Sequence, residues 1–430
     1  MDFGGHGFPK TIGLAVSEMM TSANLAFSLC PMLTGSAITL LDRHGTDELR
    51  DIYLEKLITA EWTGTMVLTE PEAGSDVGAV RAKAIPNDDG TYAISGTKIF
   101  ITWGDHDLAD NIIHLVLART PDAAPGTKGI SLFLVPKYLP DADGAPGDLN
   151  TVETVSIEHK LGIHGSPTCV LSFNAATGYL IGEEQKGMSY MFTMMNQARL
   201  EVGLEGLAIA ERAYQHAAHY AKDRKQGRAV GSAESSAIIE HADVRRMLLT
   251  MKATTEAMRG LVYDAVAAED RSHRAATPEA REAAADRLAL LTPITKSWCT
   301  DRGVELASVG VQVHGGMGFV EETGAAQFYR DARITPIYEG TNGIQAIDLV
   351  MRKLPMGGGA VIDGYLTEIE TLVTELADAG DALADVRAEL GSAVGTVRKA
   401  TEWLNESQDV NDRLAGATPY QDMLGTLAGG

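Results

Sequence analysis

Residues 92–102, YAISGTKIFIT, decide the fold, because they are rich in β-branched and aromatic side chains between regions of helical periodicity. The pair Gly96-Thr97 predicts a turn that folds this run into a β-hairpin. Further β-rich runs separated by segments rich in proline, glycine and aspartate are residues 112–118, 130–135 and 169–173. The sequence therefore predicts a small all-β domain over residues 64–183.

Helical periodicity flanks this β region on both sides. Apolar residues recur at three- and four-residue steps along residues 40–57, 188–218 and 283–311. After the glycine-rich linker at residues 356–359, an acidic helical tail begins. We therefore expect a mainly α protein with a central β domain. Its four expected parts are residues 1–63, 64–183, 184–355 and 356–430.

Composition limits the class of protein. The 430 residues are 45% apolar and 22% charged, which is typical of a globular chain with several domains. A net charge of −22 without a basic patch argues against nucleic acid as the main partner. No run of about 18 apolar residues occurs, so we expect no membrane span.

Three cysteines without CxxC spacing exclude a disulfide framework or a cysteine-rich zinc site. Residues 1–5 have neither the basic nor the apolar region of a signal peptide. We therefore expect a cytoplasmic protein in a reducing compartment.

Several common sites lack the pattern that they require. The glycine-rich residues 4–7 and 314–318 do not form a strand–GxGxxG–helix unit, and no GxSxG elbow occurs. His216 and His219 share a helix face at a spacing that ligates metals, but no acid or histidine cluster lies nearby in the sequence. We therefore expect no metal site.

Three other segments suit a cofactor or acid–base chemistry. Residues 69–76, TEPEAGSD, form either a plain turn or a polar edge for a ligand or phosphate. Phe100 and Thr102 fall on one strand face, where a ring and a hydroxyl suit a flavin, although core packing explains the phenylalanine alone. Glu339 lies in the otherwise apolar segment 334–344, as a loop or helix-terminal charge or as a functional acid. Taken singly, such segments are more often structural than catalytic.

Together and in this order, these segments resemble the acyl-CoA dehydrogenase family over nearly all of residues 1–355. The matching segments are residues 69–76, 101–102, 160–166, 312–316 and 338–341. The run at 337–346, with the acidic tail, is similar to the 3-methylmercaptopropionyl-CoA dehydrogenase-like subgroup, whose members carry an extra C-terminal helical region. Compared with that subgroup, we expect the chain to lack the opening helices of its first domain and to stop inside the tail at Gly430.

The resemblance implies both a fold and an activity. The implied fold is a helical domain, a small β-barrel, a four-helix bundle and an extra helical tail. The implied enzyme is an FAD flavoprotein of fatty acid metabolism that dehydrogenates an acyl-CoA to the trans-2-enoyl-CoA and passes electrons to an electron-transferring flavoprotein. The subgroup implies a short-chain or 3-(methylthio)propanoyl acyl group, and the family implies a homodimer or homotetramer. An acyl-CoA oxidase and a catalytically inactive scaffold remain open as alternatives.

The family's functional residues carry over position by position. Glu339 is the implied base, because the other position that members use, immediately before Arg199, is Ala198, which cannot accept a proton. We expect apolar surroundings for Glu339 from Ile334, Ile337 and Tyr338. The implied substrate-binding residues are Ser75, Asn196, Arg199 and Gly340.

The implied flavin-binding residues fall into two groups. Those that would hold the FAD of the same chain lie in the β domain or in the segment 334–344, here called the base loop. They are Leu68, Thr69, Ser75, Phe100, Thr102 and Thr341. Those that would hold the FAD of a neighbouring subunit are Arg224, Gln226, Gln312, Gly315 and Gly316. Gly227 stands where the family has a phenylalanine against the partner's flavin, so that contact is missing.

Overall fold

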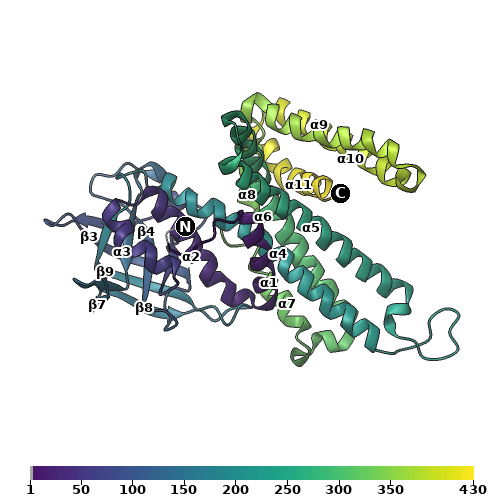
Figure 1. Ribbon diagram of the computed structural model, residues 1–430, viewed down its shortest axis with the longest axis horizontal. Helices are drawn as coiled ribbons and strands as arrows, with labels where there is room; N and C mark the ends of the chain where they lie inside the picture. The colour runs from purple at the N-terminus through teal and green to yellow at the C-terminus, as the bar shows by residue number, and fades with distance from the viewer. Residues whose placement is uncertain (1–2) are drawn as a thin grey trace. The chain divides into compact units, whose positions relative to one another are not determined.

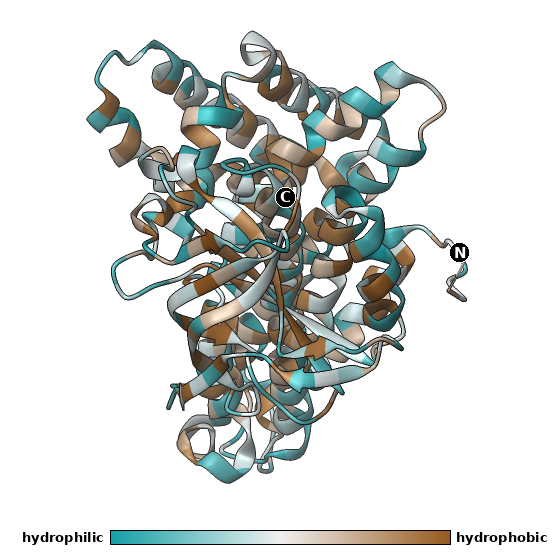
Figure 2. Cartoon of the chain, turned by 90° about the vertical axis from the view of Figure 1, so that its left-hand side faces the viewer, coloured by the Kyte–Doolittle hydropathy of each residue, from teal (hydrophilic) through white to brown (hydrophobic). Residues whose placement is uncertain are grey.

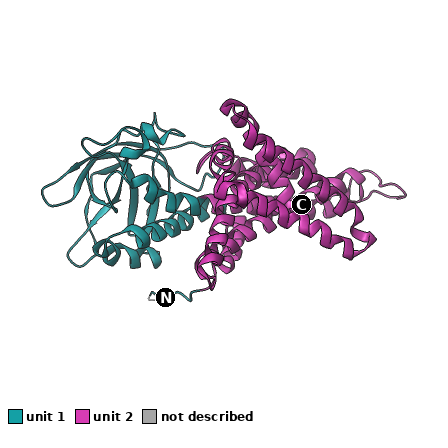
Figure 3. Cartoon of the chain, turned by 90° about the horizontal axis from the view of Figure 1, so that it is seen from above, with its two compact units in different colours: residues 1–7, 24–198 teal, residues 8–23, 199–430 magenta. Residues whose placement is uncertain are grey.

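The computed structural model describes residues 3–430; Met1 and Asp2, part of the segment searched for a signal peptide, lie outside the described residues. By its internal contacts the chain forms two compact units (Figure 3). The first holds residues 24–198 with the N-terminal segment up to Gly7, and the second holds Phe8–Ala23 and Arg199–Gly430. The division into four parts made from the sequence stays a prediction.

Two helices of the first unit precede its sheet: α2 (Leu25–His44) and α3 (Asp47–Ile58). The Thr46 side chain caps α3 by accepting a hydrogen bond from Leu49 N. Helix α2 packs closely on the sheet, since a Cβ at Gly64 would lie 2.5 Å from Ala37 Cβ. Among the described residues, α2 is long and apolar enough to cross a bilayer, but 67% of its most apolar window is buried inside the fold, as in a core helix.

Seven strands form one mixed sheet in the order β1-β4-β5-β9-β3-β2, with β8 beside β9. Strands β1 and β4 are parallel, and the other pairings are antiparallel. A separate pair consists of β6 (Tyr138–Pro140) and β7 (Pro146–Leu149). The bounds of the seven strands are β1 Trp62–Val67, β2 Lys83–Pro86, β3 Tyr92–Thr102, β4 Asn111–Ala118, β5 Ser131–Pro136, β8 Val152–Ile157 and β9 Thr168–Leu180.

The sheet curls back on itself. Just beyond β1, the carbonyl of Thr69 accepts a hydrogen bond from Ile99 N of β3 at 2.9 Å, although β1 and β3 lie far apart in the strand order. Apolar residues occur along both the strands and the helices (Figure 2). A mainly α protein with a central, barrel-like β region is therefore confirmed.

The expected hairpin at Gly96-Thr97 is wrong, because β3 is one continuous strand. Gly96 pairs with Phe173 of β9 in mid-strand, and a Cβ there would lie 2.9 Å from Ala82 Cβ. The glycine thus permits close approach of the neighbouring chain rather than a turn. A register shift between Lys98 and Ile101 in β3 marks a bulge or local irregularity of the pairing.

Helices α1 (Lys10–Ala23), α5 (Ala242–Arg274) and α6 (Pro278–His314) form the body of the second unit, with the part of α4 (Gly187–Asp223) that follows Ala198. Glycines allow α4 and α6 to touch: a Cβ at Gly206 would lie 2.4 Å from the carbonyl oxygen of Cys299. Two short helices, α7 (Ala325–Ala332) and α8 (Asn342–Asp348), follow α6.

Three more helices, α9 (Ala360–Glu375), α10 (Ala384–Glu406) and α11 (Val410–Gly429), form the C-terminal part (Figure 1). Helix α11 packs on α6, where the Trp298 indole N–H donates to Thr426 Oγ1 at 3.2 Å and a Cβ at Gly425 would lie 2.5 Å from the Trp298 ring. The acidic tail is therefore packed structure within the second unit.

Candidate functional site

Glu339 lies in a tight connection between α7 and α8. The loop is closed where Asn342 N donates to the carbonyl of Pro336 at 3.0 Å. Glu339 and Gly340 both have positive φ, 56° and 83°. A non-glycine residue in this conformation is held there by its surroundings, and such positions are enriched at functional sites. The Gln345 side chain supports the loop by donating to the carbonyl of Gly340 at 3.1 Å.

Two buried cations face Glu339 within the second unit. Burial raises the pKa of Glu339 to about 7, against the lowering effect of the positive charges on Lys296 and Arg199. Lys296 on α6 is 0% exposed, and burial lowers its pKa to about 7. Arg199 on α4 is buried as well. A carboxyl group that titrates near neutral pH suits a general base.

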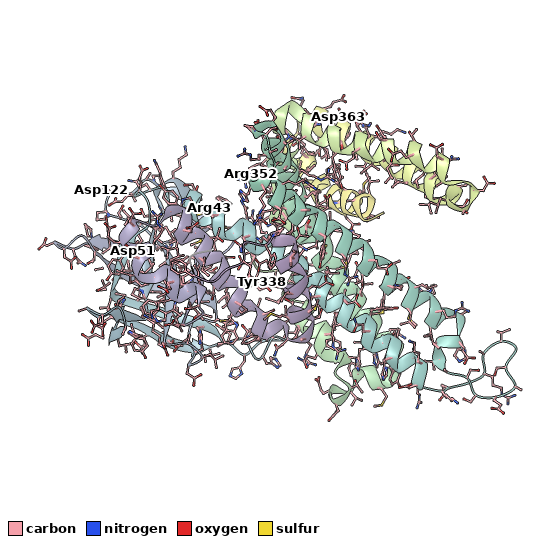
Figure 4. The ribbon with its side chains drawn as sticks, in the orientation of Figure 1. Arg43, Asp51, Asp122, Tyr338, Arg352 and Asp363 are labelled. Carbon is pink, nitrogen blue, oxygen red and sulfur yellow. The ribbon has the colours of Figure 1, made fainter. Side chains whose placement is uncertain are left out.

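A second carboxyl group lies close by on α4. Glu205 is buried and accepts a hydrogen bond from the Tyr338 hydroxyl (Tyr338 is labelled in Figure 4). Burial raises the pKa of Glu205 to about 8, so it is mainly protonated at neutral pH. The expected apolar surroundings are corrected in part: Ile334 is half-buried, but Ile337 is 52% exposed, and Tyr338 contributes a polar contact.

The predicted substrate-binding residues are divided between the two units. Arg199 and Gly340 come together in the second unit, where a Cβ at Gly340 would lie 3.5 Å from Arg199 Nη2. Asn196 and Ser75 are exposed residues of the first unit.

Four of the predicted flavin-facing residues lie on β3 or directly beside it in the first unit: Leu68, Thr69, Phe100 and Thr102. Leu68 and Thr69 lie beside β3, because Lys98 Nζ donates to the carbonyl of Leu68 at 2.9 Å and Ile99 N donates to that of Thr69. Phe100 is 58% exposed. An exposed aromatic ring beside two partly exposed residues is a surface that suits a planar tricyclic ring.

A buried ion pair supports this surface. Lys98 and Glu70 are joined at 2.8 Å with side chains 0% and 5% exposed. Glu70 also accepts hydrogen bonds from the backbone N–H groups of Arg81 (2.7 Å) and Ala82 (3.0 Å). The pair therefore ties the loop that begins at Leu68 to β3.

The residues assigned to a neighbouring subunit's FAD lie elsewhere in the second unit. The rings of Tyr220 and His314 stack at 4.4 Å, which brings together the ends of α4 and α6. The exposed residues at these ends are Arg224, Gln226, Gln312, Gly315 and Gly316. Along α4 this end is about 36 Å from Arg199, at 1.5 Å of rise per residue. Thr341, in contrast, lies in the base loop, where Thr341 Oγ1 donates to the carbonyl of Pro336 at 3.3 Å.

Among residues 3–430, no group of three or more His, Cys, Asp and Glu side chains could hold a metal ion. His216 packs against the His314 ring at 4.6 Å, and His219 pairs with Asp223 at 3.4 Å.

Sequence reasoning missed the polar residues behind the base. A sequence signal exists for Lys296, because it is the single charged residue in the run 288–300, LALLTPITKSWCT. No comparable signal marks Glu205, because acids are common along α4.

Residues 65–176 match the family described as acyl-CoA dehydrogenase, middle domain, and residues 185–354 match acyl-CoA dehydrogenase, C-terminal domain. The chain is 51% identical to a 3-methylmercaptopropionyl-CoA dehydrogenase of Ruegeria pomeroyi over 100% of its own length and 74% of the relative's. It is 41% identical to a butyryl-CoA dehydrogenase of Syntrophomonas wolfei, over 92% of this chain and 65% of that one. The fold matches an acyl-CoA dehydrogenase from Bacillus anthracis complexed with FAD, with a TM-score of 0.80 at 24% identity, over 100% of this chain and 71% of that one.

Proposed function

The chain belongs to the acyl-CoA dehydrogenase family of FAD-dependent oxidoreductases, and from this premise we propose that it oxidises an acyl-CoA to the trans-2-enoyl-CoA with Glu339 as the base. One observation carries the proposal: a carboxyl group in a strained loop, with its pKa raised to about 7, faces two buried cations. The chain spans 74% and 65% of the two relatives compared above, so the activity of the whole protein is part of the proposal.

The proton step belongs to the chain's own residues. A thioester α-proton is weakly acidic, so its removal needs a base near its operating pH and a donor for the developing enolate oxygen. Glu339 takes the proton on its carboxylate. Among the described residues the backbone N–H of Glu339 has no hydrogen-bond acceptor, which leaves it available to the thioester oxygen. Gly340 keeps the adjacent space clear of a Cβ, which would approach Gln345 Nε2 to 2.7 Å.

The residues that would hold FAD within one chain are Leu68, Thr69, Ser75, Phe100, Thr102 and Thr341. When bound, FAD supplies the acceptor for the β-hydride. Arg224, Gln226, Gln312, Gly315 and Gly316 would contribute to a neighbouring subunit's cofactor, which requires a homodimer or homotetramer.

We further propose a short-chain or 3-(methylthio)propanoyl acyl group and transfer of electrons to an electron-transferring flavoprotein in the cytoplasm. The similarity to the Ruegeria pomeroyi enzyme supports this substrate class. Arg199, buried beside Gly340, would lie next to the bound acyl-CoA.

The test is an anaerobic titration of the purified flavoprotein with a panel of acyl-CoAs that includes butyryl-CoA and 3-(methylthio)propanoyl-CoA. We expect bleaching of the oxidised flavin absorbance by short acyl groups. A flavin that no acyl-CoA reduces, or a protein that does not bind FAD, would contradict the proposal and support a scaffold. Oxygen consumption with acyl-CoA as sole substrate would identify the oxidase alternative.

A further inference from the structure

Lys296 is an unusual buried cation. Its residue is 0% exposed, and the hydrogen bond that anchors its ammonium group runs to a neutral amide, Asn342 Oδ1, at 2.8 Å. A buried ammonium group normally has a carboxylate partner, because removing it from water is costly. No carboxylate among the described residues lies within ion-pair distance of Lys296. The position of this charge therefore calls for a functional explanation.

Asn342 joins Lys296 to the base loop. It is the first residue of α8 and follows Glu339 by three positions. Its amide group donates to Asp301 Oδ1 at 2.9 Å and to Thr300 Oγ1 at 3.0 Å, both on α6. These bonds fasten the start of α8 to the segment of α6 that carries Lys296, and they orient the amide oxygen towards the ammonium group.

The charged and titratable groups around Glu339 and its two cations come from four elements of the second unit. Helix α4 contributes Arg199 and Glu205, α6 contributes Lys296 and Asp301, the loop itself contributes Tyr338, and α8 contributes Asp348, which acts on Arg199. Of the charges near Lys296, that of Glu339 most strongly favours the protonated ammonium form of the lysine. Because the two groups form no direct ion pair, the effect acts through the poorly screened interior. Glu205 acts on Glu339 in the opposite sense whenever it is ionised.

We propose that Lys296, anchored by Asn342, is a positioning residue whose positive charge favours the carboxylate form of Glu339 in the resting protein. The inference rests on the proposed role of Glu339 as the base and adds the group that keeps it ready to accept a proton. Lys296 does not need to touch the thioester: its positive charge stabilises the ionised form of Glu339, and the Asn342 bonds keep that charge in place.

The test follows the protonation of Glu339 directly, without turnover. Difference infrared spectra recorded against pH on the flavoprotein show the C=O band of protonated carboxyl groups, and the band lost in Glu339→Gln belongs to Glu339. In Lys296→Met we expect the midpoint of this band to rise by about one to three pH units, because a nearby opposite charge is lost. Lys296→Arg, which retains the charge, should recover most of the shift. Lys252→Met is the matched control, since it removes an exposed lysine paired with Glu256.

An unchanged midpoint in folded Lys296→Met would overturn the proposal, as would an equal shift in Lys296→Arg, which would indicate a packing role. If Lys296→Met does not fold, Asn342→Ala replaces it: loss of the anchor should raise the midpoint by a smaller amount, and no shift would reject the idea. Turnover serves as a separate readout, because the acidic limb of the kcat/KM profile should move with the infrared midpoint. A protein without acyl-CoA activity that still shows the infrared shift would reject the proposed function but retain the charge coupling.

Discussion

The two units each bury a lysine completely, and the contrast between them separates support from chemistry. In the first unit Lys98 meets a carboxylate, Glu70, at 2.8 Å and also donates to the carbonyl of Leu68. In the second unit Lys296 donates to an amide, while the carboxyl groups near it, Glu339, Asp301 and Glu205, form no ion pair with it. Because Lys98 and Glu70 contact each other and also bond to the backbone, this pair has a structural role. Burial lowers the pKa of both lysines, that of Lys98 to about 8 and that of Lys296 to about 7, so the two differ in direct contact with a carboxylate rather than in their own titration.

The largest expected effect is on turnover, and it comes from substitution of the proposed base, Glu339. Glu339→Gln should lower turnover by roughly 10²–10⁴-fold, because the amide cannot accept the α-proton. FAD content and acyl-CoA binding should stay close to those of the parent. The measurement is anaerobic stopped-flow reduction of the flavin by the best substrate. Near-parent rates would show that the group of residues around Lys296 and Glu339 has only a structural role, like the Lys98–Glu70 pair.

The free energy of unfolding should distinguish Lys98 from Lys296. Lys98→Met leaves Glu70 buried without its cation and should cost about 3–5 kcal/mol of unfolding free energy. It should also weaken FAD retention, because the loop that begins at Leu68 loses its tie to β3. Urea unfolding of Lys98→Met, Lys296→Met and the parent measures the difference. Lys296→Met should cost less, because Glu339 forms no direct ion pair with Lys296 and can take up a proton when that charge is lost. An equal cost would remove the distinction between the two lysines.

The smallest effect concerns Glu205. Its pKa is raised from 4.5 to about 8 in the folded protein. Between pH 4.5 and pH 8, Glu205 is therefore mainly protonated in the folded protein and mainly ionised in the unfolded chain. The contribution of Glu205 to stability is therefore present at low pH and is lost as pH rises towards 8. The free energy of unfolding of Glu205→Gln, relative to that of the parent, should rise over this pH range by at most about 1.4 kcal/mol per pH unit. Thermal unfolding at several pH values measures the gain, and parallel curves would show that Glu205 is ionised in the fold.

Much of the architecture was predictable from local patterns. Helices along residues 40–57, 188–218 and 283–311 and β structure between them follow from periodicity, and α2–α3, α4 and α6 occupy those places. The hairpin failed because Gly96 carries the same local signal for a turn as for a strand packed closely on a neighbour. Only the position of Ala82 distinguishes the two.

The site was predictable in part for the same reason. Glu339 lies in a recognisable motif, and the structure places Arg199 and Gly340 beside one another in the second unit. Lys296 and Glu205 come from helices far from residue 339 in sequence, and the polar contacts of Tyr338 depend on how those helices pack. Such contacts carry no local signature.

The sequence by itself determined the order of helical and β regions, the family and the identity of the candidate base, because periodicity and motif are properties of short segments. Tertiary structure alone decided which charges surround that base and which buried lysine is paired. Burial and partner distance set the energy of a charge, and both depend on residues brought together by folding.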